Sequence, residues 1–361
     1  MSVVYFAGQG ASGAHNAPST VYIGAGGGDT LTAVARHLVD TTSPAAYVLG
    51  AGYPRGQYYE SLTKNANNKK RKEVVERVGV SPAQANGYLD TVMLQPKGSS
   101  DPDFWTVGAY ADINQLLAAS TPEDKPNIPE LEESGEGWVG DLHETAGFTY
   151  KTMFAEAKAS AAGYPCDMFI STDKTEGAAY DAMVGTLRAY FAFRNAARVV
   201  VLDIGGDIVN PSKPGRDKAV LKACQEVCQM MNIPAVCEVY GPGCDGLETV
   251  ERVVSDLVES HGARTIDSTT LGRFKMTLKY RKLDLLVGES KQGRATGNFM
   301  LAAQGAPYEE FEKGIELRSE FQNHTNGVPK TEAEKAAFRA ANAADKAKTL
   351  RDAAGGWFFP L

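Results

Sequence analysis

Short, almost continuously hydrophobic runs recur along the chain, with segments of helical spacing between them. The runs are rich in Val, Ile and Leu, which is typical of strands buried on both faces of a parallel sheet. Alternating strands and helices form βαβ units, so we predict an α/β fold: a doubly wound, mostly parallel, Rossmann-like sheet with helices on both faces. The predicted strands are 21–24, 46–49, 91–94, 167–171, 198–202, 235–239 and 283–287. The predicted helices are 30–39, 70–78, 152–161, 177–193, 216–231, 247–260 and 271–280.

Two regions depart from this alternation. Residues 96–147 are rich in proline, glycine and acidic residues and contain two tryptophans, which predicts a loop-rich acidic insertion that could act as a lid. Near the C-terminus, Thr331 and Glu334 form a capping-box pattern that predicts one long helix to about residue 354, followed by an aromatic tail. We expect the tail to pack on the body or on a second subunit. The predicted organisation is one α/β domain over 1–330 that contains the insertion, then a C-terminal helix and tail over 331–361.

Three of the predicted strands end in glycines accompanied by an aspartate. These turns are Gly24–Asp29, Asp203–Asp207 and Gly241–Gly246. In open α/β sheets, ligands bind outside the carboxyl ends of the strands. We therefore expect the three turns to surround a single small-molecule site.

The first turn does not fit the known nucleotide-binding loops. Gly24 and Gly26 match the start of the dinucleotide motif G-x-G-x-x-G, but its third glycine position falls on Asp29. The second predicted strand ends without the carboxylate that would hold a ribose, and no Walker lysine follows the glycines. NAD and FAD are therefore not supported. A polar or oxyanionic ligand near Gly26, Gly27, Gly28 and Asp29 remains open, as does a helix-capping role for Asp29.

The second turn is the most specific of the three. Asp203 closes a strongly apolar strand, where a carboxylate is costly unless it is paired, metal-bound or hydrogen-bonded. Asp207 follows after Gly205 and Gly206, which permit a sharp turn. Two adjacent carboxylates can hold a divalent cation, bind ligand hydroxyls or share a proton as acid and base. We assign Asp203 and Asp207 the chemical role, and they are the metal ligands if a metal binds.

Other candidates lie near further strand ends. Gly241 and Gly243 can bring backbone close to a ligand, while Asp245 either contacts that ligand or caps the next helix. Lys174 follows the strand at 167–171 and can neutralise an anionic substrate or remain solvated.

Two further candidates lie in loops. Arg55 can supply a guanidinium fork to a phosphate or carboxylate, or be an ordinary surface residue. His143, beside acidic residues, can be a general base or metal ligand brought in by a closing flap, or a surface histidine.

Charge and hydropathy narrow the class of partner. A net charge of -7 and a pI near 5.4 argue against nucleic acid, which requires a basic face. No apolar run approaches the roughly 20 residues needed to cross a bilayer, and the first residues have no signal-peptide pattern. We expect a soluble, cytoplasmic protein that binds a small molecule.

The three aspartate turns together resemble those of an uncharacterised family, domain of unknown function 1152. The resemblance rests on Gly24–Asp29, the segment 202–207 and the segment 240–246. It implies an α/β fold and assigns no reaction.

Three function hypotheses follow from these observations. The favoured one is an enzyme of the transferase or hydrolase class, not a typical NAD-dependent dehydrogenase, that acts on a small anionic or nucleotide-like metabolite. The second is a divalent-metal-dependent hydrolase that uses Asp203 and Asp207, with His143 as a further candidate ligand. The third is a non-catalytic ligand-binding or assembly protein, whose aromatic tail could form a homo-oligomer.

Overall fold

The structure is a computed structural model that describes residues 17–26, 29–40, 45–52, 93–94, 104–107, 166–210, 215–281, 295–325 and 331–361. Its described strands join into one mixed sheet in the order β3-β4-β5-β2-β1-β6-β7-β9-β8. The parallel centre consists of β5 (Asp167–Ile170), β2 (Ala46–Gly52), β1 (Ser19–Gly24), β6 (Ala196–Ile204) and β7 (Ala235–Tyr240). The predicted α/β class is confirmed, and β1 lies between β2 and β6, where the order of the strands changes direction.

Antiparallel strands complete both edges of the sheet; β3 falls within the predicted strand 91–94, whereas β4, β8 and β9 were not predicted from the sequence. β4 (Phe104–Val107) pairs with β5 and with β3 (Met93–Leu94), and it lies inside the predicted insertion 96–147. The rest of that insertion lies outside the described residues. At the other edge, β9 (Gly356–Pro360) pairs with β7 and with β8 (Arg264–Thr265). These strands are short, and a few residues carry too little periodicity to be recognised in a sequence.

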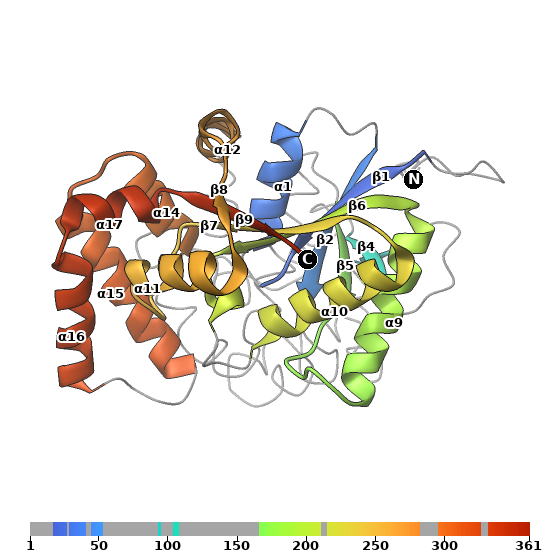
Figure 1. The fold of residues 1–361 in the computed structure, drawn as a ribbon, viewed down its shortest axis with the longest axis horizontal. Coiled ribbons are helices and arrows are strands. Elements are labelled where there is room, and N and C mark those ends of the chain that lie inside the picture. The colour runs from blue at the N-terminus through green and yellow to red at the C-terminus, as the bar shows by residue number, and fades with distance from the viewer. Residues whose placement is uncertain are drawn as a thin grey trace, which may run out of the picture.

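Helices cover both faces of the sheet. In Figure 1, α1 (Asp29–Val39) and α12 (Ser268–Arg281) lie on one face, while α9 (Ala178–Phe193) and α10 (Arg216–Met231) lie on the other. Each face has its own hydrophobic core, and successive residues of β1 alternate between them, with Tyr22 in one and Val21 and Ile23 in the other. Of the other described helices, α11 (Val250–Ser255), α14 (Ala295–Ala303), α15 (Tyr308–Thr325), α16 (Glu332–Ala343) and α17 (Lys346–Ala353) lie toward the left of Figure 1. The short η3 (Asp256–Ser260) follows α11 directly, and its Leu257 packs in the core that α9 and α10 cover.

Most predicted elements that fall within the described residues are present, with shifted ends. The predicted helix 247–260 begins only at Val250, because Thr249 caps it by accepting a hydrogen bond from the Arg252 amide. The predicted helices 70–78 and 152–161 and the predicted strand 283–287 lie outside the described residues. Among the described helices, none combines the length and apolar character that crossing a bilayer requires.

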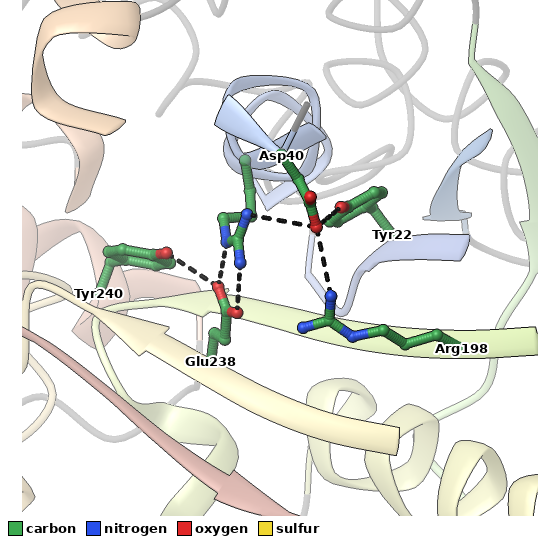
Figure 2. Close-up of polar contacts among 6 residues, drawn as sticks. Tyr22, Asp40, Arg198, Glu238 and Tyr240 are labelled. Carbon is green, nitrogen blue, oxygen red and sulfur yellow. Dashed lines mark hydrogen bonds and ion pairs between the residues drawn. The ribbon is translucent and has the colours of Figure 1, made fainter. Parts of the chain in front are cut away.

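A buried polar network fastens α1 to the sheet. The Arg36 guanidinium donates from Nε and Nη2 to both carboxylate oxygens of Glu238 on β7, at 2.7 and 3.1 Å. The Tyr240 hydroxyl donates to the same carboxylate at 2.8 Å. Figure 2 shows Asp40, just after α1, held by the Tyr22 hydroxyl and the Arg198 guanidinium. Because each buried carboxylate of this network receives hydrogen bonds from cationic and hydroxyl donors, the network tolerates burial.

We expect this ion pair to be strongly cooperative. Arg36→Met and Glu238→Leu should each lower the free energy of unfolding by about 3–5 kcal/mol, because each leaves one charge buried without its partner. The double variant should lose clearly less than the sum of the two, as read from urea unfolding curves. The exposed pair Lys346–Glu309, at 3.0 Å, is the matched control and should show little coupling. Additive losses at Arg36 and Glu238 would contradict the assignment.

The C-terminal region is two helices rather than the single long helix predicted over 331–354. The predicted capping box is confirmed: Thr331 Oγ1 accepts from the Glu334 amide, and the Glu334 carboxylate accepts from the Thr331 amide. The chain leaves helical geometry at Asp345, whose carboxylate accepts from the Lys348 amide and caps α17. An aspartate favours such an N-cap over a place inside a helix, so it divides the alanine-rich segment.

The aromatic tail belongs to the chain's own sheet. β9 runs antiparallel to β7 and places Trp357 and Phe359 in the core that α9 and α10 cover, where both side chains are buried. Phe359 also lies against the His261 ring, with centroids 4.7 Å apart.

Phe359→Ala should therefore lower the free energy of unfolding by about 3–5 kcal/mol, as expected for a buried aromatic side chain. Met230→Ala, at a side chain that is 58% exposed, is the control and should change stability little. Thermal or urea unfolding of the two variants checks the prediction. Equal free energies of unfolding for the two variants would mean that the packing of β9 does not stabilise the sheet.

Candidate functional site

The turn from β1 into α1 brings the first aspartate to the carboxyl end of the sheet. Asp29 is the first residue of α1, is buried, and accepts a hydrogen bond from the Gly26 amide at 2.6 Å. A Cβ atom on Gly26 would lie 2.7 Å from carboxylate oxygens of both Asp29 and Asp217. Glycine at position 26 thus leaves room for two carboxylates to approach each other.

The end of β6 supplies the second and third aspartates. Asp203 is buried, and its Oδ2 accepts from the Gly206 amide at 2.8 Å. Gly205 and Gly206 have φ angles of 121° and 96°, which residues other than glycine rarely adopt. The two glycines therefore allow the backbone to reverse direction here. Asp207 then opens a short 3₁₀ turn, η2 (Asp207–Val209).

The end of β7 supplies the fourth aspartate and is tied to the end of β6. The Gly243 amide donates to the Gly205 carbonyl at 2.6 Å, and a Cβ on Gly205 would lie 2.5 Å from Asp245 Cβ. Asp245 is buried, and its Oδ1 accepts from the Leu247 amide at 3.1 Å. The expected capping alternative for Asp245 is wrong, because the helix begins five residues later with Thr249 as its N-cap.

Three charged groups of this site were not predicted from the sequence. Arg216 and Asp217 begin α10, and their side chains contact each other at 3.5 Å between Nε and Oδ1. Arg318 comes from α15 and is buried. An acid in the first turn of the helix that follows β6 was the available signal for Asp217. Arg318 had no local signal, because it reaches the site from a helix about a hundred residues further along.

Asp29, Asp203 and Asp217 come closest together. One carboxylate oxygen from each can be chosen so that all three oxygens lie within 4.8 Å of one another. The sequence-predicted partner Asp207 lies outside this triad but interacts electrostatically with each of its members.

The cluster disfavours ionisation of its own carboxyls. Burial first, and then the neighbouring Asp217 carboxylate, raise the pKa of Asp29 to about 8. Burial and the carboxylates of Asp207, Asp29, Asp217 and Asp245 raise the pKa of Asp203 well above its ordinary value. The same two causes raise the pKa of Asp207. Burial also lowers the pKa of Arg318, although the surrounding aspartates oppose this shift.

Negative charge is in excess at this site among the described residues. The cluster holds five aspartates, Asp29, Asp203, Asp207, Asp217 and Asp245. The cations that interact with them are Arg216, Lys218 and Arg318, and Lys218 also faces Asp256. Five ionised carboxylates would outnumber these cations by two. Bound protons, a bound cation or a cationic ligand can restore the balance.

Of the other predicted site residues, Gly241 and Gly243 lie in the β7 turn of the site, Lys174 lies apart from it, and the rest fall outside the described residues. Lys174 follows β5, which β2 separates from β1, and its exposed ammonium contacts the Asp173 carboxylate at 3.4 Å. Gly241 and Gly243 lie in the β7 turn with positive φ angles, next to Phe299 and Val250 respectively. Gly27, Gly28, Arg55 and His143 lie outside the described residues.

Comparisons with known proteins add no relative: no protein-family model, no curated protein and no solved structure matches the chain.

The contacts at Gly26 generate a prediction about packing. Gly26→Ala should lower the free energy of unfolding by about 1–3 kcal/mol, because the new methyl group would push the Asp29 and Asp217 carboxylates apart. Gly272→Ala in α12, where a Cβ meets nothing within 4 Å, should instead raise it by about 0.5–1 kcal/mol. Urea unfolding of both variants gives the two signs. A stabilising effect at both positions would show that the carboxylates are not held against Gly26.

Proposed function

We propose that the chain is an enzyme of the transferase or hydrolase class that acts on a small anionic or nucleotide-like metabolite at the carboxyl ends of β1, β6 and β7. The observation that carries this proposal is the convergence of aspartates from three separate strand ends on one buried cluster. Nothing in the packing of an α/β domain requires so many carboxylates at one point, and their mutual repulsion opposes folding. Groups kept at a cost to stability are typical of functional sites.

Asp203 and Asp207 are the pair to which we give the chemical role. Both have raised pKa values, from burial and from neighbouring carboxylates, and the Asp207 carboxylate is among the charges that raise the pKa of Asp203. A carboxyl that keeps its proton near neutral pH can donate it to a leaving group, while an ionised neighbour accepts one from the attacking group. The pair therefore suits a general acid–base step.

An anionic substrate needs a counter-charge here, because ionised aspartates would repel it. Arg318 and Arg216 can supply guanidinium groups for a phosphate or carboxylate. The second candidate function, a divalent-metal-dependent hydrolase, meets the same need through a cation, and the approach of Asp29, Asp203 and Asp217 within 4.8 Å favours it.

Several finer expectations remain part of this proposal. The doubly wound, Rossmann-like arrangement is supported by the strand order around β1 and by helices on both faces. Resemblance to the domain of unknown function 1152 family rests on the three aspartate turns alone. A small-molecule ligand, a cytoplasmic location and a homo-oligomer formed by the tail stay predictions, as does a non-catalytic binding role.

The test begins with a ligand and ends with turnover. A thermal-shift screen of the full chain against nucleotides, sugar phosphates and amino acids should find a stabilising ligand, whose conversion is then followed by mass spectrometry. Asp203→Asn and Asp207→Asn should each lower kcat by about 100-fold or more, the loss typical of removing a general acid or base. Both should unfold at the same temperature as the wild type or higher, because each replaces a carboxyl whose ionisation the cluster opposes with a neutral amide of similar size.

Asp181→Asn, on the exposed first turn of α9, is the control and should keep full activity. A ligand that binds but is never converted would favour the non-catalytic alternative. Full turnover in both cluster variants would refute the proposed role of Asp203 and Asp207.

A further inference from the structure

The aspartate cluster contains a three-carboxylate arrangement with the spacing of a cation site. The chosen oxygens of Asp29, Asp203 and Asp217 all lie within 4.8 Å of one another. Oxygens around one Mg²⁺, Mn²⁺ or Ca²⁺ ion are separated by about 3–5 Å, given metal–oxygen distances of about 2.0–2.6 Å. Three carboxylates on three different segments therefore already stand at ligand spacing.

Among the described residues, one buried oxygen of this cluster has no hydrogen-bond donor. Asp203 is 1% exposed, and although its Oδ2 accepts from the Gly206 amide, its Oδ1 has no hydrogen-bond partner among the described residues. The charged groups that act most strongly on this carboxyl are other carboxylates, those of Asp207, Asp29, Asp217 and Asp245. A buried carboxylate oxygen that faces like charges needs a proton or a cation.

The surrounding backbone holds the three carboxylates in place. Asp29 and Asp217 each lie in the first turn of a helix, and Asp203 lies at the end of a central strand. Gly26 admits the Asp29 and Asp217 carboxylates against its Cα, while the Gly26 amide fixes one oxygen of Asp29. Ligands on rigid elements lose little freedom when an ion binds.

The donor set selects the kind of ion. All three ligands are carboxylates, and hard oxygen donors favour Mg²⁺, Mn²⁺ or Ca²⁺ over the softer ions that histidine and cysteine bind. Among the described residues, five ionised carboxylates would outnumber Arg216, Lys218 and Arg318 by two charges, which a divalent ion would match. Three protein ligands leave further coordination positions for water and for an oxygen of an anionic ligand.

We infer that Asp29, Asp203 and Asp217 bind one divalent cation of this hard, oxygen-seeking class through their carboxylates. The ion would let an anion approach a cluster that otherwise repels it. Cation binding stands on the geometry alone, whereas a part for the ion in turnover rests on the proposed function.

The test measures binding directly on the full-length chain. After removal of bound metal with EDTA and dialysis, titration calorimetry with MgCl₂ and with MnCl₂ in 0.2 M KCl should give one site per chain. The potassium salt screens loose attraction to acidic surface groups. Mn²⁺ electron paramagnetic resonance should independently show the loss of one free ion per chain.

Variants then separate coordination from simple electrostatics. Asp217→Asn removes a ligand and should weaken Mn²⁺ binding by at least 10-fold. Asp245→Asn removes an equal charge from the same cluster but no ligand of the triad, so it should weaken binding clearly less. Asp181→Asn should leave binding unchanged.

A measurement on the wild type guards against a variant that fails to fold. Millimolar MnCl₂ should raise the unfolding temperature of the EDTA-treated chain, while KCl of the same ionic strength should not. The inference is overturned if neither Mg²⁺ nor Mn²⁺ binds at millimolar concentration. It is also overturned if Asp245→Asn weakens binding as much as Asp217→Asn.

The two proposals fail in different ways. Cation binding with no turnover of any ligand would leave the cation site standing and remove the enzyme. Turnover that depends on Asp203 in a chain that binds no divalent ion would leave the enzyme standing and remove the cation site.

Discussion

Repulsion between buried carboxylates is the constraint that organises the carboxyl end of this sheet. Asp29, Asp203 and Asp245 are buried near one another, and each interacts with further aspartates. Separate carboxylates would be more stable in water, so the fold must hold them together against both desolvation and like charge. The surrounding hydrogen bonds show how: the amides of Gly26, Gly206 and Leu247 each fix one aspartate. The backbone amides of the turns at the strand ends therefore also bind the aspartate carboxylates.

The structure shows a role for the glycines of these turns that the sequence does not indicate. Bare backbone at a strand end suggests close approach of a ligand, and that was the expectation for all three turns. At Gly26 and Gly205 the space that a Cβ would occupy is filled by carboxylates or by the Asp245 side chain. The glycines of these two turns therefore let acidic side chains converge.

The sequence predicted the parallel centre of the sheet and the strand ends that bear the site, because long apolar runs and glycine–aspartate turns are strong local signals. It did not predict β4, β8 or β9, whose few residues have no readable period, and it joined α16 and α17 into one helix across Asp345. Within the site it found Asp29, Asp203, Asp207 and Asp245, which lie at the ends of strands or in the turns that follow them. It missed Asp217 and Arg318, since their place depends on how α10 and α15 pack, and no local pattern encodes that packing.

The two polar clusters of the molecule show that this chain can neutralise a buried acid when burial is the only requirement. Under α1, Glu238 receives both arms of Arg36 and the Tyr240 hydroxyl, and Asp40 receives Tyr22 and Arg198. On the neighbouring strand, Asp203 faces carboxylates and keeps one oxygen without a donor among the described residues. Glu238 and Asp203 both lie on parallel strands of the same sheet, so the fold alone does not explain why only Glu238 is paired with a cation. The difference lies in the neighbours that the sequence supplies: beside Asp203 these are four other aspartates, an arrangement expected where a bound proton or cation supplies the missing positive charge.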